Sequence, residues 1–208
     1  MSSAWWCAEL RRLSNRNRTS LLMRDPDDHE TPTARMFAWA RNSAAYRLSR
    51  AMMTERQLRD AISRKARQKF EGIGDAQVLA LADAAIRFAY DNKALDDRAY
   101  AEFSTRAATR SGKSRRTIAQ KLSIKGVDRD MALDAVKGAD DLFAAVVPAR
   151  KRRLGPFRRE KLEEGQLAKE MASFARSGFG YEIGRRILAM TAEDAEEILA
   201  LGPREIED

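Results

Sequence analysis

The stretch Ser114-Arg-Arg-Thr-Ile-Ala-Gln-Lys-Leu-Ser-Ile-Lys-Gly126 decides the fold of this chain. A serine that can cap a helix is followed by apolar residues four and eight positions later, and then by a glycine that can end the helix. The segment Thr54-Glu-Arg-Gln-Leu-Arg-Asp-Ala-Ile62 has the same pattern upstream. The segment Gly180-Tyr-Glu-Ile-Gly-Arg-Arg-Ile-Leu188 keeps the second apolar position but has glycine at the first. We interpret the three segments as equivalent helices of an internal repeat.

Each of these short helices lies between two other predicted helices. The preceding helix carries an aromatic residue, which is Phe37 or Tyr46, then Tyr100 and Phe103, then Phe174. The following helices are predicted over residues 75–92, 128–139 and 192–201. A single unit buries little apolar surface by itself, so neighbouring units must share their apolar faces. The sequence therefore predicts an all-α protein of three tandem three-helix repeats that form an elongated, curved helical array. A generic helical bundle is the alternative.

Apolar residues at helical spacing predict the buried faces of several helices. The predicted stripes are Phe37, Ala40, Ala44, Leu48 and Ala51, then Val78, Leu81, Ala82, Ala85, Ile86 and Ala89, then Tyr100, Phe103 and Ala107. No segment shows the sustained alternation that is typical of strands. No proline lies between Pro32 and Pro148, and we expect Pro148 to limit the helix before it.

These signals divide the chain into five predicted parts. Residues 1–34 are rich in polar residues and lack helical periodicity, so we expect a mobile N-terminal tail. Helical repeats follow over residues 35–93 and 94–147. A basic junction and the third repeat are predicted over 148–202, and an acidic tail over 203–208.

Several motifs of this chain resemble those of the RecX family. The segment Leu95-Asp-Asp-Arg-Ala-Tyr-Ala101 resembles the link into the family's middle repeat, and residues 112–127 resemble its most characteristic stretch. Residues 152–157 and 176–181 are similar to the third repeat of some members. The resemblance implies a non-enzymatic, three-repeat protein that lies in the helical groove of the RecA–DNA filament. There it would limit filament growth, inhibit the recombinase, and so regulate DNA repair and recombination, meeting single-stranded DNA within the filament.

The distribution of charge indicates a polyanionic partner independently of that resemblance. The net charge is +8, with seven basic and no acidic residues between Ser104 and Gly126, and seven acidic residues against one basic residue over 192–208. The candidate residues for binding the filament or DNA are Arg106, Arg110, Lys113, Arg115, Arg116, Lys121, Lys125, Arg150, Lys151, Arg152, Arg153, Arg185 and Arg186. The alternatives are a solvated helix face, or a stand-alone nucleic-acid-binding protein that inserts the helix beginning at Ser114 into a groove.

Motifs for catalysis, cofactors and metals are weak. Gly112-Lys113-Ser114 imitates the end of a phosphate-binding loop, but such a loop needs glycine where the chain has Ala107. His29 lies in the predicted tail between Asp28 and Glu30, where a preorganised metal site or a serine–histidine pair is not expected. We therefore expect no enzymatic activity, no cofactor and no bound metal.

The remaining features favour a cytoplasmic monomer. Cys7 is the only cysteine, so no disulfide can form within the chain, and a reducing compartment fits. No window is apolar enough for a membrane span, and we see no secretion signal at the N-terminus. Trp5 and Trp6 have no assigned role.

Overall fold

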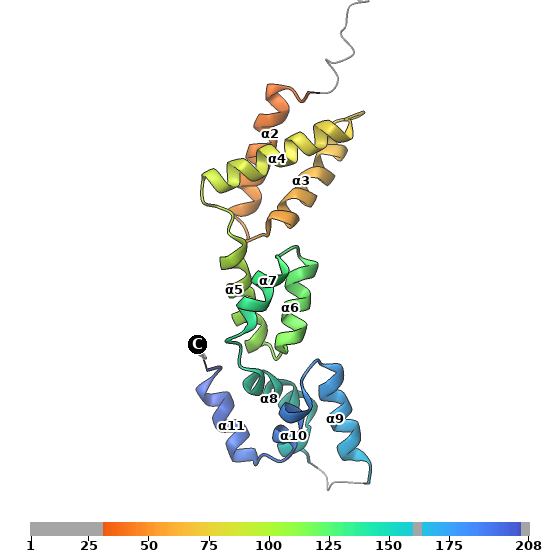
Figure 1. Cartoon of the computed structure of the whole chain (residues 1–208), viewed down its shortest axis with the longest axis vertical. Helices are drawn as coiled ribbons and strands as arrows, with labels where there is room; N and C mark the ends of the chain where they lie inside the picture. The colour runs from red at the N-terminus through yellow and green to blue at the C-terminus, as the bar shows by residue number, and fades with distance from the viewer. Residues whose placement is uncertain (1–30, 160–163, 205–208) are drawn as a thin grey trace, which may run out of the picture.

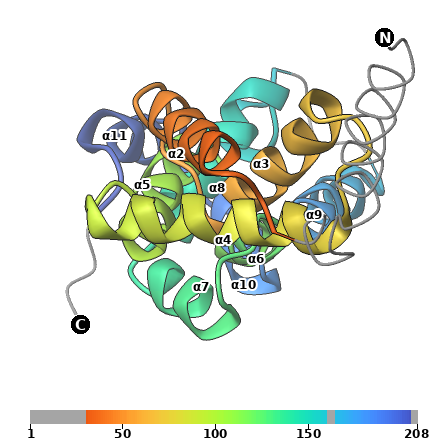
Figure 2. The ribbon, with the colours of Figure 1, turned by 90° about the horizontal axis from the view of Figure 1, so that it is seen from above.

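The computed structural model describes residues 31–159 and 164–204. Within these ranges every regular element is a helix and no strand occurs, so the all-α prediction is confirmed. Figure 1 shows groups of helices stacked along the longest axis of the molecule, and Figure 2 shows the same groups overlapping when seen along that axis. The predicted tail, with Trp5, Trp6 and His29, lies almost entirely outside the described residues, as do residues 205–208.

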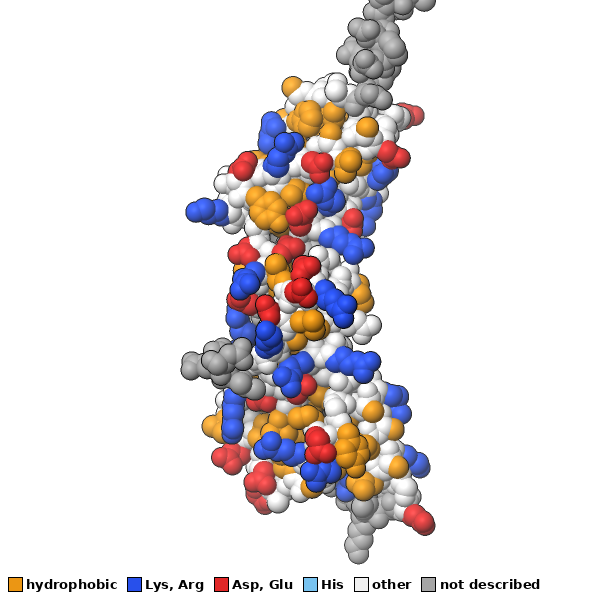
Figure 3. All heavy atoms as spheres, viewed as in Figure 1, with side chains coloured by type: hydrophobic (Ala, Val, Ile, Leu, Met, Phe, Trp, Pro, Cys, Tyr) orange, Lys and Arg blue, Asp and Glu red, His pale blue; other side chains and the backbone are white. Residues whose placement is uncertain are grey.

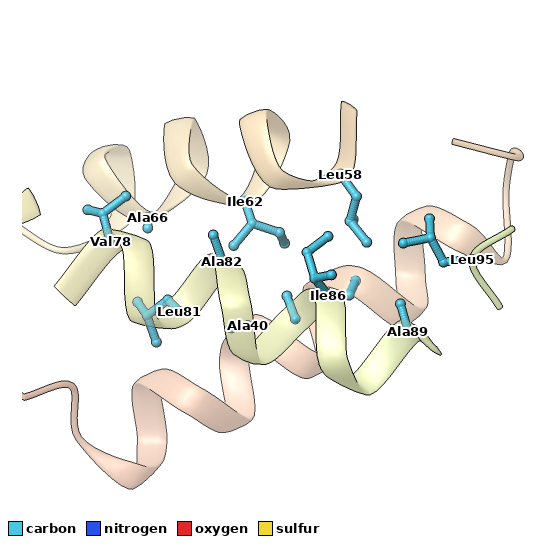
Figure 4. Packing of buried hydrophobic residues seen from close by; sticks show 12 residues of the cluster. Ala40, Leu58, Ile62, Ala66, Val78, Leu81, Ala82, Ile86, Ala89 and Leu95 are labelled. Carbon is cyan, nitrogen blue, oxygen red and sulfur yellow. The ribbon is translucent and has the colours of Figure 1, made fainter. Parts of the chain in front are cut away.

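The first group of helices has the largest continuous core. It consists of α2 (Ala34–Leu48), α3 (Glu55–Lys69) and α4 (Asp75–Asp91). Helix α4 packs against both other helices, and its stripe from Val78 to Ala89 is buried as predicted. Figure 4 shows Leu58 and Ile62 of α3 pointing toward Ala82 and Ile86 of α4. Fully burying a side chain such as Leu58 contributes roughly 1.5–3 kcal/mol.

The second group corrects one predicted stripe. It consists of α5 (Asp97–Arg110), α6 (Arg115–Ile124) and α7 (Arg129–Val136). Ile118 and Leu122 of α6 are buried as expected, but Phe103 is 57% exposed, and Ala107 is exposed as well. Tyr100 of the same stripe is buried as predicted. The rest of the buried face of α5 consists of Ala101, Thr105 and Thr109, and the helix packs against α6, α7 and α8.

The third group contains one α-helix more than the others, and a short 3-10 helix as well. It consists of α8 (Asp141–Arg152), the short 3-10 helix η2 (Gly155–Phe157), α9 (Gln166–Arg176), α10 (Tyr181–Leu188) and α11 (Ala192–Leu201). Its core combines Phe174, Phe179 and Ile187 with the alanines of α8. Helix α8 contacts α5 of the second group as well as α10 and α11.

The prediction that Pro148 limits a helix is wrong. Helix α8 continues through Pro148 to Arg152. Val146, two residues before the proline, and Ala149, directly after it, are fully buried. Packing of these neighbours outweighs the cost of proline inside a helix, which is about 3 kcal/mol. The boundary that we predicted at residue 148 consequently falls inside α8.

The register of the third repeat also differs from the prediction. The turn Ser177-Gly178-Phe179 matches the turn Lys125-Gly126-Val127, because each glycine has a positive φ (+83° and +95°) and each following apolar residue is buried. Gly180 therefore begins α10 as Asp128 begins α7, and is not equivalent to Ser114. Helices α8, α9 and α10 correspond to α5, α6 and α7, and α11 is additional. Glycine is also common at helix N-caps, so the segment beginning at Gly180 matched the pattern of the segments beginning at Thr54 and Ser114 although it belongs to a different helix of the repeat.

The three groups are joined by a contact that occurs twice. Thr54 caps α3 as predicted, and its buried hydroxyl also donates to the carbonyl of Lys125 at the end of α6 (2.6 Å). Ser114 caps α6, and its buried hydroxyl donates to the carbonyl of Ser177 at the end of α9 (2.9 Å). Each hydroxyl thus accepts a hydrogen bond at the start of a helix in its own group and donates one at the end of a helix in the next group.

A carboxylate completes each junction. The backbone N–H of Glu55 donates to Asp97 Oδ1 (2.9 Å), and the backbone N–H of Arg115 donates to Asp141 Oδ1 (2.7 Å). Asp97 and Asp141 are the first residues of α5 and α8. Each carboxylate lies at the positive end of the helix dipole of a neighbouring group. Burial raises the pKa of Asp97, although the hydrogen bond from Glu55 acts to lower it.

The turn glycines allow the groups to approach closely. A Cβ at Gly126 would lie 2.3 Å from Cβ of Arg56, and a Cβ at Gly178 would lie 2.6 Å from the Ser114 hydroxyl. Gly72 has the same positive φ at the corresponding turn of the first group, but nothing lies within 4 Å of its Cβ position. Glycine at Gly72 is therefore required only by the backbone conformation, whereas at Gly126 and Gly178 the close approach of another group requires it as well.

A buried ion pair holds η2 against α9. Glu170 is 4% exposed, and it accepts hydrogen bonds from the guanidinium of Arg158 (2.6 and 2.9 Å) and from the backbone N–H of Gly155 (2.9 Å). Burial acts to raise the pKa of Glu170, but these hydrogen bonds outweigh it and lower the pKa below its ordinary value of 4.5. The carboxylate is thus stabilised in its charged form.

Alanine at Gly126 should be more destabilising than alanine at Gly72. Both changes place a side chain at positive φ, which costs about 1 kcal/mol, but only Gly126→Ala also forces Arg56 and the junction apart. We expect a loss of roughly 3 kcal/mol for Gly126→Ala and about 1 kcal/mol for Gly72→Ala, measured by urea unfolding. Equal losses would contradict the close approach at the junction.

The hydroxyl of Thr54 should contribute more than that of an ordinary helix cap. Thr54→Ala removes the cap and leaves the Lys125 carbonyl without this donor, so we expect a loss of about 2–3 kcal/mol. Thr33 caps α2 at an exposed site, and among the described residues its side chain bonds only to Met36, so Thr33→Ala should cost about 1 kcal/mol. Chemical denaturation of both variants measures the difference, and similar losses would argue against the junction bond.

The ion pair at Glu170 should make stability depend on pH in the acidic range. Because the pKa is lowered by folding, the stabilisation is complete above about pH 4.5 and is lost as pH falls through the folded-state pKa. Glu170→Gln should cost about 2 kcal/mol at pH 7. The difference between wild type and Glu170→Gln, measured by denaturation from pH 7 to pH 3, should shrink below pH 4.5. A difference that stays constant to pH 3 would refute the assignment.

Candidate functional site

All thirteen basic residues that the sequence proposes as binding candidates are exposed. The structure does not place them on one continuous surface, however. Twelve of them lie in three places, which are a groove beside α6, a set of hollows around Arg204, and the C-terminal end of α8. Arg116 lies on α6 outside all three places. On the face shown in Figure 3, blue cationic side chains are interspersed with red acidic ones over the middle of the molecule.

The first place brings three of the candidate lysines together. Lys113, Lys121 and Lys125 line a groove of about 680 Å³ between the α2–α3 loop, α5 and α6, which we call the lysine groove. Its other lining residues are mostly apolar and include the exposed Phe103. The Lys125 ammonium donates to the Tyr100 hydroxyl (2.7 Å) and lies 5.4 Å from the centre of that ring. One lysine of the groove is therefore held in position by an aromatic side chain.

The second place collects arginines from three helices. Arg106 and Arg110 of α5 line a cavity of about 240 Å³ together with Arg204, which follows α11. Arg115 and Arg186 line an adjoining hollow that Arg204 also borders. Carboxylates reach these hollows too, since Asp140 lines both of them and its Oδ2 accepts from the backbone N–H of Arg204 (3.2 Å). We call this set of hollows the arginine cluster.

The third place is the end of α8, where four basic residues follow one another. Arg150 pairs with Glu196 of α11 (3.4 Å), and Arg152 donates to the hydroxyl of Ser173 (3.0 Å). Arg153 ends the helix with φ +58°, in the left-handed conformation. Cations at the C-terminal end of a helix interact favourably with its dipole. Part of this basic run therefore serves the packing of the third group.

The candidates divide into those with and those without a partner inside the chain. Arg115 pairs with Asp141 (3.3 Å) at the junction, and Arg185 pairs with Glu182 (2.9 Å). Within the described residues, no ion pair, hydrogen bond or ring contact engages the side chains of Arg106, Arg110, Lys113, Arg116, Lys121, Lys151, Arg153 or Arg186. Such unpaired cations are free to meet an external anion. Arg115, in contrast, has a structural role.

Two features of the surface were missed from the sequence. Arg204 was assigned to the acidic tail, although it borders three of the hollows. Arg204 is the one basic residue among the acids of 192–208, and this feature of the sequence could have indicated it. Phe103 was assigned to the core, and no local pattern distinguishes an exposed aromatic residue from a buried one on a half-apolar helix.

The described residues offer no metal site and no phosphate-binding loop. Within residues 31–159 and 164–204, no three His, Cys, Asp or Glu side chains are grouped to hold a metal ion. The Gly112 motif lies in a turn between two helices, where a Cβ on the glycine would contact Pro148 of α8 (2.8 Å). A phosphate-binding loop instead follows a strand. In the same part of the chain, no helix combines the length and apolar character needed to cross a membrane.

Comparison with known proteins identifies the family. A family model described as RecX, second three-helix domain, matches residues 96–136, which include α5, α6 and α7. The chain is 59% identical over 172 residues to the regulatory protein RecX of Agrobacterium fabrum, covering 83% of this chain and 94% of that protein. The chain belongs to the RecX family. The regulatory protein RecX of Myxococcus xanthus is 34% identical over 71% of this chain and 82% of its own length.

A solved RecX structure has the same fold. The crystal structure of RecX from Lactobacillus salivarius superimposes with a TM-score of 0.60, covering 79% of this chain and 99% of that chain, at 22% sequence identity. The helical repeat architecture is thus shared by RecX proteins whose sequences have diverged widely. The family places this chain among regulatory proteins, and regulation of DNA repair and recombination fits that membership.

Proposed function

We propose that this RecX-family chain inhibits the RecA recombinase by binding in the groove of the RecA–DNA filament and limiting filament growth. The observation that carries the proposal is the 59% identity to a RecX regulatory protein over nearly all of that protein's length. The elongated array supports it, since a stack of repeats offers an extended surface suited to a long helical partner. We propose that it acts as a monomer, without catalysis or cofactor, in the cytoplasm, where the filament forms.

The unpaired cations supply the physical basis for binding. Arg106, Arg110 and Arg116 are exposed and lack intramolecular partners among the described residues, so no internal ion pair has to break when an anion binds. The phosphates of single-stranded DNA in the filament, or acidic side chains of the recombinase, provide the opposite charge. Binding of this kind weakens as salt concentration rises.

Reversing the charge of the unpaired arginines should weaken the inhibition. The triple variant Arg106→Glu, Arg110→Glu and Arg116→Glu keeps the junction pair of Arg115, and should lower inhibition of RecA-catalysed ATP hydrolysis and strand exchange at least tenfold. The matched control reverses Arg64, Lys65 and Arg87, which are exposed cations of the first group outside the candidate set. If three phosphate contacts are lost, the slope of log affinity against log salt should fall by roughly 2–3.

Inhibition and DNA-binding assays with the wild-type protein distinguish the two candidate functions. Inhibition at amounts well below one protein per recombinase would support action on filament growth. Tight, salt-sensitive binding to naked DNA without any effect on the recombinase would favour the stand-alone nucleic-acid-binding protein instead. An unchanged inhibition constant in the triple variant would exclude these arginines from the interface.

A further inference from the structure

The lysine groove differs from the rest of the basic surface in having an apolar floor. Phe103, at 57%, and Met52, at 49%, are exposed large apolar side chains, and both line the groove beside the buried Leu122. The walls come from two groups, since Met52 lies in the α2–α3 loop whereas the lysines belong to the second group. The first group therefore adds Ala51 and Met52 to a groove that is otherwise lined by the second group.

The cations lie along one side of this floor. Lys121 and Lys125 are four residues apart on or at the end of α6, so they stand one above the other about 6 Å apart along the helix, and Lys113 precedes the same helix. No carboxylate of residues 31–159 or 164–204 lines the groove. In the arginine cluster, by contrast, Glu102 and Asp140 lie among the arginines. The lysine groove is thus the most uniformly cationic of the hollows in the described part of the chain.

This chemistry favours a protein segment over a nucleobase. Single-stranded nucleic acid is usually held by several flat aromatic faces along a cationic track, and here Phe103 is the one exposed aromatic ring. A base inserted among the apolar side chains of the groove would lose water from its polar edges, and only Ser104, Ser111 and the lysines could replace that water. Aliphatic side chains have no such cost, and methionine adapts readily to the shape of a partner.

We infer that the lysine groove binds an acidic, amphipathic segment of the recombinase protein itself, an inference that rests on the proposed function. Apolar side chains of that segment occupy the floor beside Phe103 and Met52. Its carboxylates, at helical spacing, meet Lys121 and Lys125. This is the arrangement of an amphipathic helix in a groove, with apolar anchors and a charged rim. The groove then contacts the protein component of the filament, while the unpaired arginines remain available for its phosphates.

The variant Phe103→Ala tests the inference. Its side chain is mostly exposed, so truncation should leave the unfolding midpoint almost unchanged. We expect binding to the assembled recombinase–DNA filament, measured by co-sedimentation, to weaken at least tenfold. Binding to a naked single-stranded oligonucleotide, measured by fluorescence anisotropy, should change less than twofold. The matched control Ile124→Ala truncates an exposed apolar side chain of α6 that lies outside the groove, and should change neither.

A charge variant gives a second, independent reading. Lys121→Glu should weaken filament binding at least tenfold with little effect on the oligonucleotide, whereas Arg116→Glu, on the same helix outside the groove, should weaken both. Loss of oligonucleotide binding in Phe103→Ala would overturn the inference and make the groove a site for bases. Wild-type filament binding in both groove variants would overturn it as well. Wild-type protein that neither binds nor inhibits the filament would refute the proposed function itself, which separates the two failures.

Discussion

The architecture depends on one polar contact, in which the hydroxyl that caps a helix in one repeat also donates to the last carbonyl of a helix in the next. Helix ends leave backbone groups without partners, and these ends would otherwise have to face water. Thr54 and Ser114 satisfy a helix start and a helix end at the same time, while fully buried. Asp97 and Asp141 add a carboxylate at the same helix starts. The groups are thereby fixed in a repeated orientation by directional bonds, in addition to apolar packing.

This junction explains why small residues are needed at several positions between the groups. Gly126 and Gly178 are needed where a turn of one group approaches a helix of another, and the alanines and threonines of α5 allow similar closeness. It also explains the double role of basic residues near these sites. Arg115 pairs with Asp141 across the junction, so its charge belongs to the fold, whereas Arg116 beside it has no partner in the described part of the chain. Of these two neighbouring arginines, one stabilises the junction and the other is available for an external partner.

The basic residues of the surface lie in two kinds of surroundings. Arginines gather around Arg204 with carboxylates among them, whereas lysines gather over an apolar floor. Helix α11 contributes to the first arrangement, since it follows the three-helix pattern as an addition and carries acids close to Arg150 and Arg186. A filament of protein and nucleic acid presents both acidic side chains and phosphates. Two separate cationic sites with different surroundings suit such a composite partner.

The sequence by itself determined the helical class, the number of repeats, the helix caps at Thr54 and Ser114, and the buried stripe of α4, because these follow from local periodicity and from short-range hydrogen bonding. It did not determine the register of the third repeat, the continuation of α8 through Pro148, or the exposure of Phe103. It also did not show that the basic candidates lie in separate parts of the surface, and it left out Arg204. These features depend on which helices pack together, and contacts between residues far apart in the chain leave no local periodicity by which they could be recognised.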